Sequence, residues 1–223
     1  MDFIYNVKYG YMREREEFAS LSHYLNNNTN NIIVDAMNSI IAIGRDFMQY
    51  PDKYLTESDV RCFLFNEFMH HPSFNSLSST SDGSQSIPVH TEVRWYGNEG
   101  KLKYRSDMVI IETSDLITKG KFFKLPSKGF GFNKFNAIVE IKLRRSNGEN
   151  YGSFIKKIEY DIEKLIKIEK DVAEANILSY ASFVVILDKK NENNNMHNLI
   201  EHKFLTLEKY HPEMDLFIYY ARS

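Results

Sequence analysis

The chain has 223 residues, of which 43% are hydrophobic and 14% are aromatic, so it carries enough apolar mass to fold around a core and is not a disordered polypeptide. Its 28 basic and 30 acidic side chains give a net charge of -2, which excludes a uniformly basic nucleic-acid-binding tail but allows a local basic face. The single cysteine, Cys62, excludes an internal disulfide framework and a multi-cysteine zinc site.

No apolar run approaches the roughly 20 residues needed to span a bilayer, and the N-terminus lacks a signal-peptide pattern. We therefore expect a soluble, cytoplasmic protein with no membrane partner. The length favours a single domain over 1–223. Within it we expect an N-terminal helical extension over 1–50, a core over 56–187 and a C-terminal helix–strand addition over 188–223.

Helical patterns dominate the N-terminal third of the chain. A charged stretch within the first 24 residues predicts a short helix, and apolar residues at helical spacing predict an amphipathic helix over 32–50. A second helix is predicted over 56–71, because Thr56 and Asp59 form a capping-box pattern at its start.

The middle and the end of the chain alternate strands with helices. The pattern predicts a hairpin of strands 89–95 and 102–112, and a buried strand over 137–143. The remaining predicted elements are helix 152–174, strand 182–187, helix 196–210 and strand 216–220. This order predicts an α/β fold in which a central mixed β-sheet is flanked by helices.

Glu57 stands out in the second predicted helix. At 100° per residue its side chain projects onto the apolar face, where a carboxylate is unfavourable unless it has a partner. The alternative is that Glu57 only favours the N-terminus of the helix electrostatically.

Three charged residues in the predicted sheet carry the chemistry. Asp107 lies in the second hairpin strand, and strand periodicity places Glu140 and Lys142 on one face of the buried strand. If the two strands are neighbours, Asp107 lies next to Glu140. Two carboxylates at a sheet edge suit Mg²⁺, to which the carbonyl of Ile141 can add an oxygen ligand. Lys142 beside such an ion could orient a water molecule and offset charge that grows on a phosphate.

The alternative for Glu140 and Lys142 is an exposed ion pair, which is worth about 0–1 kcal/mol. The apolar residues on both sides argue against it, because charges in a buried strand need a partner.

The motif Ser106-Asp107, followed after a long insertion by Glu140-Ile141-Lys142, resembles the PD-(D/E)XK nuclease superfamily. The resemblance covers roughly 56–187 and implies the restriction-endonuclease-like α-β-β-β-α-β core. Ser106 stands where the name-giving proline would be. The helix after Lys142 shows no glutamine-and-tyrosine pattern, so an exonuclease of the type fused to helicases is not indicated.

The resemblance implies Mg²⁺-dependent hydrolysis of phosphodiester bonds in DNA, with Mn²⁺ as a substitute ion, by an endonuclease of restriction, mobile-element or repair type. It implies that Asp107 and Glu140 bind the metal and that Lys142 activates water and stabilises charge. It also matches Glu57 to the acid that members carry on the first core helix near the metal, and so implies that Glu57 is a further catalytic and metal-binding residue.

Other residues are candidates for auxiliary roles. Glu92 either assists the metal site or binds Lys142, or it pairs with Arg94 or a neighbouring strand. Arg144 and Arg145 follow the catalytic strand and are candidates for binding the DNA backbone.

Two groups of lysines are further candidates for phosphate contact. The segment 119–135 holds five lysines, five phenylalanines and no acid, which suits phosphate contacts combined with base stacking. The alternative is a loop whose phenylalanines cover the core. Its candidate nucleic-acid-binding residues are Lys119, Lys121, Lys124 and Lys128. On the following helix, Lys156, Lys157 and Lys164 are interpreted as a solvated face, with phosphate contact as the alternative.

The leading hypothesis is therefore a Mg²⁺-dependent deoxyribonuclease. A catalytically silent nucleic-acid-binding or regulatory module of the same fold is the alternative, as is a nuclease that acts on RNA or branched junctions. Binding of Mg²⁺ would separate an enzyme from a silent module. Cutting both strands with one active site per chain favours a homodimer.

Overall fold

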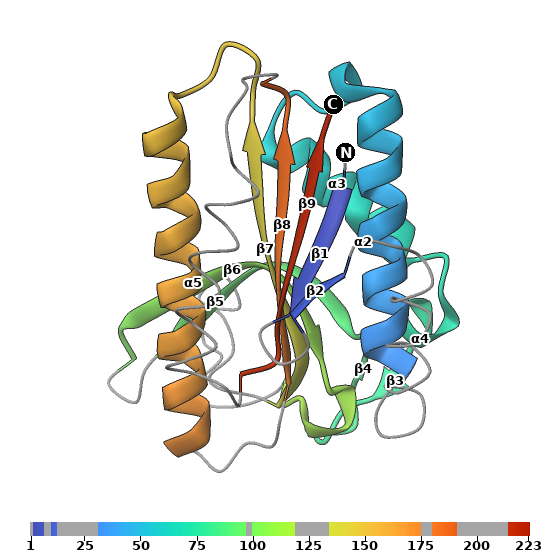
Figure 1. Cartoon of the computed structure of the whole chain (residues 1–223). Helices are drawn as coiled ribbons and strands as arrows, with labels where there is room; N and C mark the ends of the chain where they lie inside the picture. Colours follow the sequence, from blue (N-terminus) through green and yellow to red (C-terminus); the bar gives the residue numbers. More distant parts are fainter. Residues whose placement is uncertain are drawn as a thin grey trace.

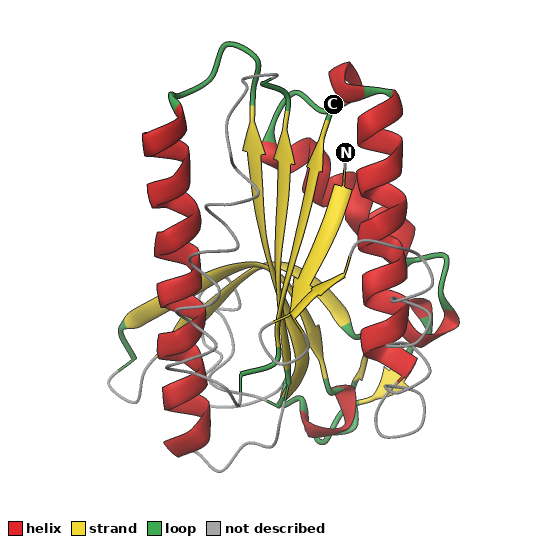
Figure 2. Ribbon diagram, in the orientation of Figure 1, coloured by secondary structure: helices red, strands yellow, loops and turns green. Residues whose placement is uncertain are grey.

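A computed structural model describes residues 2–6, 10–12, 31–96, 100–118, 134–174, 180–190 and 214–223. A seven-stranded sheet in the order β2-β1-β9-β8-β7-β6-β5 runs between helices on both of its faces (Figure 1, Figure 2). The predicted α/β class with a mixed central sheet is confirmed. Among the described helices, none combines the length and the apolar character needed to cross a membrane.

The bounds of the elements are as follows. The strands of the large sheet are β1 (Asp2–Asn6), β2 (Gly10–Met12), β5 (Val89–Tyr96), β6 (Leu102–Ile111), β7 (Phe135–Arg144), β8 (Ala181–Asp188) and β9 (Leu216–Arg222). The helices are α2 (Asn31–Gln49), α3 (Glu57–Phe68), α4 (Pro72–Asn75) and α5 (Tyr151–Glu174), with short 3₁₀ turns η1 (Pro51–Lys53) and η2 (Thr113–Asp115). A small separate hairpin joins β3 (Ser78–Ser79) to β4 (Gln85–Ser86).

Two hydrophobic cores lie on opposite faces of the sheet. Strands β7, β8 and β9 are parallel, and the other neighbours in the sheet are antiparallel. Helices α2 and α3 cover one face, and α5, which connects β7 to β8, covers the other (Figure 1). Strand β8 is buried along its whole length, as expected for a central parallel strand with helices on both sides.

The start of α3 follows the predicted capping box. The hydroxyl of Thr56 accepts a hydrogen bond from the backbone N–H of Asp59 at 3.2 Å, and the carboxylate of Asp59 accepts one from the backbone N–H of Thr56 at 2.8 Å. These two side-chain bonds fix the start of the helix at a defined residue.

The N-terminal segment differs from the prediction. Residues 2–6 and 10–12 form strands β1 and β2, and β1 pairs with β9 in an antiparallel ladder. The expected helical extension is therefore wrong in its first part, because Phe3, Ile4 and Tyr5 are buried where β1 extends the sheet. Its charged stretch after residue 12 lies outside the described residues, as do the predicted helix 196–210 and the segment 119–133.

Helix α2 packs against β9 through Gly44. A Cβ atom at this position would overlap the ring of Tyr219, which is 2% exposed and donates a hydrogen bond to Asp2 at 3.3 Å. The absence of a side chain at Gly44 therefore allows the close approach of the helix to the sheet.

We expect Gly44→Ala to lower the free energy of unfolding by about 1–3 kcal/mol, the usual effect of overpacking a core. Helix propensity alone predicts the opposite sign, a gain of about 1 kcal/mol. Urea denaturation measures the difference. Asn38→Ala, on the exposed side of the same helix, is the control and should not lower the free energy of unfolding. Equal stability of the two variants would contradict the packing described here.

Candidate functional site

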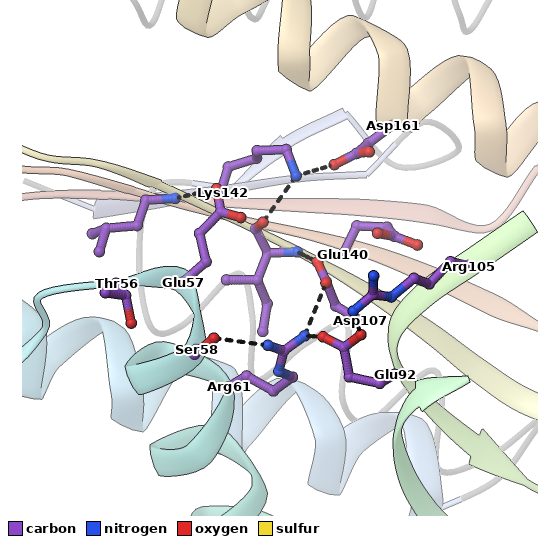
Figure 3. A network of polar contacts seen from close by, with 12 residues as sticks. Thr56, Glu57, Ser58, Arg61, Glu92, Arg105, Asp107, Glu140, Lys142 and Asp161 are labelled. Carbon is purple, nitrogen blue, oxygen red and sulfur yellow. Dashed lines mark hydrogen bonds and ion pairs between the residues drawn. The ribbon is translucent and has the colours of Figure 1, made fainter. Parts of the chain in front are cut away.

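The candidate site lies where β6 separates from β7. The two strands pair from Ile111–Phe135 to Met108–Val139, and β7 then continues to Arg144 beside β8 alone. Along this last part of β7, side chains form hydrogen bonds with the backbone groups that would otherwise face β6 (Figure 3). Asp107 accepts a hydrogen bond from the backbone N–H of Ile141 at 2.9 Å, and Lys142 donates one to the carbonyl of Ile141 at 3.0 Å.

Asp107 and Glu140 meet at this separation. The register of Met108–Val139 and Val109–Ile138, extended by one residue, places Asp107 opposite Glu140. Opposite residues of an antiparallel pair project from the same face. The neighbouring strands that the sequence predicted for these two acids are therefore present.

Glu140 is a deeply buried carboxylate. Its residue is 1% exposed, and its Oε1 atom has no hydrogen-bond partner among the described residues. Burial raises the pKa of Glu140 to about 8, and the charge of Asp107 adds to this effect while Lys164 opposes it. A carboxylate in this position calls for a compensating positive charge.

Helix α5 supplies part of that charge through an alternating row of ions. Lys164 lies 2.6 Å from Glu140 and 3.3 Å from Asp161, and Asp161 lies 2.5 Å from Lys142. We call Glu140, Lys164, Asp161 and Lys142 the α5-side row. Burial alone would lower the pKa of Lys142, but the carboxylate of Asp161 raises it above its ordinary value. Lys142 is therefore an ammonium group and not a general base at neutral pH.

A second alternating row starts from Asp107 on the other side. Arg61 of α3 lies 3.3 Å from Asp107 and also pairs with Glu92, which in turn pairs with Arg105 (Figure 3). We call Asp107, Arg61, Glu92 and Arg105 the α3-side row. Glu92 belongs to this row and pairs with arginines of α3 and β6. The predicted alternative of a partner on a neighbouring strand is confirmed by Arg105. Among the described residues, the ion pairs of Glu92 include neither Lys142 nor Arg94.

The backbone of Glu92 is unusual. Its φ of 57° lies in the left-handed region, which is unfavourable for a residue with a side chain. The pairs Thr91–Met108 and Val93–Ser106 bracket Glu92, so it lies opposite Asp107. Such strain costs about 1–3 kcal/mol and is concentrated at functional sites.

The two rows end in carboxylates that face each other. Asp107 ends one row and Glu140 ends the other, and no cation among the described residues lies within ion-pair distance of both. Two like charges at adjacent positions repel unless a positive charge or a proton comes between them. The charges of Asp107 and Glu140 would thus favour a cation bound between the two rows.

The donor set at this place suits a hard divalent ion. Asp107, Glu140 and the carbonyl of Ile141 provide the oxygen ligands that Mg²⁺ prefers, and the unpartnered Oε1 of Glu140 is available for it. Within the described part of the chain, no three His, Cys, Asp or Glu side chains are grouped closely enough to hold a metal ion. A Mg²⁺ ion here would therefore retain several water ligands, as it commonly does.

Glu57 lies at the same edge but not in the apolar core. It is the first residue of α3 and is exposed, which corrects the expectation that its side chain faces the core. Its Oε1 atom accepts a hydrogen bond from the backbone N–H of Leu143 at 3.4 Å (Figure 3). Leu143 is two residues after Ile141, so its N–H group points to the same edge of β7. Burial lowers the pKa of Lys142, whereas Asp161 raises it, and the charge of Glu57 raises it by a smaller amount than Asp161 does.

The predicted nucleic-acid contacts have different outcomes. Arg144 is 1% exposed and pairs with Asp188 at 3.5 Å, so it does not present a surface to a DNA backbone and that prediction is corrected. Its guanidinium also lies over the rings of Tyr151 and Phe154, at 5.7 and 5.8 Å from their centroids. The neighbouring Arg145 is exposed, as phosphate contact requires.

The predicted lysine contacts divide between described and undescribed residues. Lys156 and Lys157 are exposed on α5, whereas the side chain of Lys164 is 13% exposed. The solvated face expected for these three lysines is therefore wrong for Lys164. Lys119, Lys121, Lys124 and Lys128 lie outside the described residues.

The roles of Arg61, Asp161 and Lys164 in the two rows were not predicted from the sequence. A signal for Asp161 was present, because it is three residues after Ile158 and four before Leu165 and therefore lies on the apolar stripe of α5. A charged residue in such a stripe needs a partner, as does Glu140 across from it. Arg61 gives no comparable signal in the sequence, although its side chain is only 15% exposed in the structure.

Comparisons with protein-family models, with curated proteins and with solved structures return no significant match.

We expect Arg144→Ala to lower the free energy of unfolding by about 3–5 kcal/mol, because it leaves the buried carboxylate of Asp188 without its ion pair. Arg145→Ala, one residue away and exposed, is the matched control and should change stability by no more than about 0.5 kcal/mol. Chemical denaturation followed by circular dichroism measures both. An Arg144→Ala variant as stable as Arg145→Ala would contradict a structural role for Arg144.

Proposed function

We propose that this chain is a metal-dependent nuclease that hydrolyses phosphodiester bonds in DNA, as its resemblance to the PD-(D/E)XK superfamily implies. The observation that supports it best is the meeting of Asp107 and Glu140 on adjacent strands, at the ends of two rows of ion pairs that share no cation. Lys142, the third residue of the motif, lies two residues after Glu140 on the same strand.

The proposed metal ligands are Asp107, Glu140 and the carbonyl of Ile141, with Glu57 close to the same strand edge. A Mg²⁺ ion bound there would supply a Lewis acid that withdraws charge from the phosphate oxygens. Hydrolysis forms a bond from a water oxygen to phosphorus and breaks the bond from phosphorus to the leaving sugar oxygen.

Lys142 is suited to stabilise the negative charge of this transition state. It forms an ion pair with Asp161 and donates a hydrogen bond to the carbonyl of Ile141. An ammonium group has three N–H donors, so a further one can reach a water molecule or a phosphate oxygen. Fixed donors of this kind act where charge develops and need no reorganisation during the reaction.

A catalytically silent module of the same fold is the second candidate. The observation in its favour is that the four acids and four bases of the two rows already balance each other. Buried ion pairs also occur purely as structural elements. A silent module would bind nucleic acid without hydrolysing it and need not bind Mg²⁺.

We expect Lys142→Met to lower the turnover number for nicking of supercoiled DNA by about 10²-fold or more, the usual effect of removing one fixed donor. Binding of DNA, measured by fluorescence anisotropy in Ca²⁺ or EDTA, should change little. Lys156→Met, an exposed lysine of α5, is the charge-matched control and should retain turnover. Supercoiled, single-stranded and branched DNA and RNA are compared in Mg²⁺, Mn²⁺ and EDTA. Metal-dependent cleavage by Lys142→Met at the wild-type rate would contradict the role of this lysine.

We further expect the lysine-rich segment to contribute to binding of the phosphate backbone. Replacing Lys119, Lys121, Lys124 and Lys128 with alanine should weaken DNA binding and flatten its salt dependence, by about 0.9 in logarithmic slope for each lost contact with duplex DNA. The control replaces four exposed lysines of α5, which are Lys156, Lys157, Lys167 and Lys170. An unchanged slope in the first variant, measured by anisotropy from low to moderate salt, assigns the segment a structural role.

A further inference from the structure

Lys164 differs from the other lysines of α5. Lys156, Lys157, Lys167 and Lys170 are exposed, whereas the side chain of Lys164 is 13% exposed and points at the sheet. Burying an ammonium group is unfavourable unless its charge and its donors are matched. The contacts of Lys164 therefore indicate why the fold retains it.

Lys164 has three oxygen-bearing partners. Its ammonium group lies 2.6 Å from Glu140 and 3.3 Å from Asp161, and it donates a hydrogen bond to the backbone carbonyl of Arg105 at 3.1 Å. If the contact with Glu140 is lost, a second carboxylate and a carbonyl remain within reach. Lys164 can thus give up Glu140 and stay paired.

Glu140 cannot give up Lys164 as easily. No other ion pair of Glu140 is present among the described residues, and its Oε1 atom has no hydrogen-bond partner. An unpaired carboxylate at 1% exposure is strongly unfavourable, so the charged Glu140 keeps Lys164 until another cation or a proton replaces it.

The other carboxylate of the site has the same arrangement. Arg61 lies 3.3 Å from Asp107 and has Glu92 as a second acidic partner. Each of the two proposed carboxylate ligands is therefore paired with a basic residue that has an alternative acid beside it. A divalent ion placed between the ligands would repel both of these basic groups.

Resting on the proposed function, we propose that Lys164 is the resident counter-ion of Glu140 and that a divalent cation displaces it onto Asp161 when it binds between Asp107 and Glu140. The lysine keeps the site stable before the metal arrives. It also weakens metal binding, because the ion must break the contact between Lys164 and Glu140. Lys164 acts here as a positioning residue for Glu140.

The test is binding of Mg²⁺ alone, measured by isothermal titration calorimetry at fixed pH and ionic strength, together with thermal unfolding in EDTA and in saturating Mg²⁺. Lys164→Met removes the charge and keeps the length of the side chain. We expect it to bind Mg²⁺ about tenfold more tightly than the wild type, a coupling of ordinary size. In EDTA it should melt at a lower temperature than the wild type. Saturating Mg²⁺ should raise its melting temperature by more than that of the wild type.

Two further variants separate charge from packing. Lys164→Arg keeps the positive charge, so its affinity for Mg²⁺ should stay within about twofold of the wild type. Lys167→Met removes an exposed charge from the same helix and should leave both affinity and melting unchanged. If Lys164→Met is unfolded in EDTA, the proposal requires that Mg²⁺ restore its folding.

The outcomes distinguish this inference from the proposed function. If the wild type binds Mg²⁺ and Lys164→Met binds it equally or more weakly, the counter-ion role is overturned and the nuclease proposal remains intact. Lys164→Met that remains unfolded at saturating Mg²⁺ also overturns that role. If neither protein binds Mg²⁺, the metal site and the counter-ion role both fail. Binding by Lys164→Met but not by the wild type supports displacement.

Discussion

The separation of β6 from β7 after Met108–Val139 is the constraint on which the candidate site depends. It exposes N–H and C=O groups in the middle of a sheet, where unpaired backbone groups are costly. Asp107 and Glu57 accept the N–H groups of Ile141 and Leu143, so the ladder is completed by carboxylates instead of a neighbouring strand. If β6 paired with β7 along its whole length, these N–H groups would bond to β6 and not to the two acids.

The acids at this opening then require positive charge, and the surrounding helices provide it. Arg61 comes from α3 on one side, and Lys164 comes from α5 on the other (Figure 1). The two helices pack on opposite faces of the sheet, so neither helix by itself neutralises both acids. The rows they form end at Asp107 and Glu140, and the repulsion between these two carboxylates is what makes the position suitable for a cation.

The buried ion pair of Arg144 and Asp188 differs from the two rows in how its charges are compensated. Arg144 and Asp188 lie at the carboxyl ends of β7 and β8, and the tyrosine hydroxyl of Tyr220 and the backbone N–H of Lys190 also bond Asp188. This group is closed, because its acid and its base are adjacent and further donors complete it. The rows at Asp107 and Glu140 are open, because two acids face each other across the strand separation.

The sequence by itself determined the helices and strands of the core, because apolar periodicity and the capping box at Thr56 are local properties. It also marked Asp107, Glu140 and Lys142 as candidates, because charges in an apolar strand need a partner wherever the strand lies. Only the tertiary structure decided that Phe3 lies in a strand, that Arg144 is buried, and that Arg61 and Lys164 pair with the two acids. These features depend on contacts between segments far apart in the chain, and local patterns specify which face of an element is buried but not what it meets there.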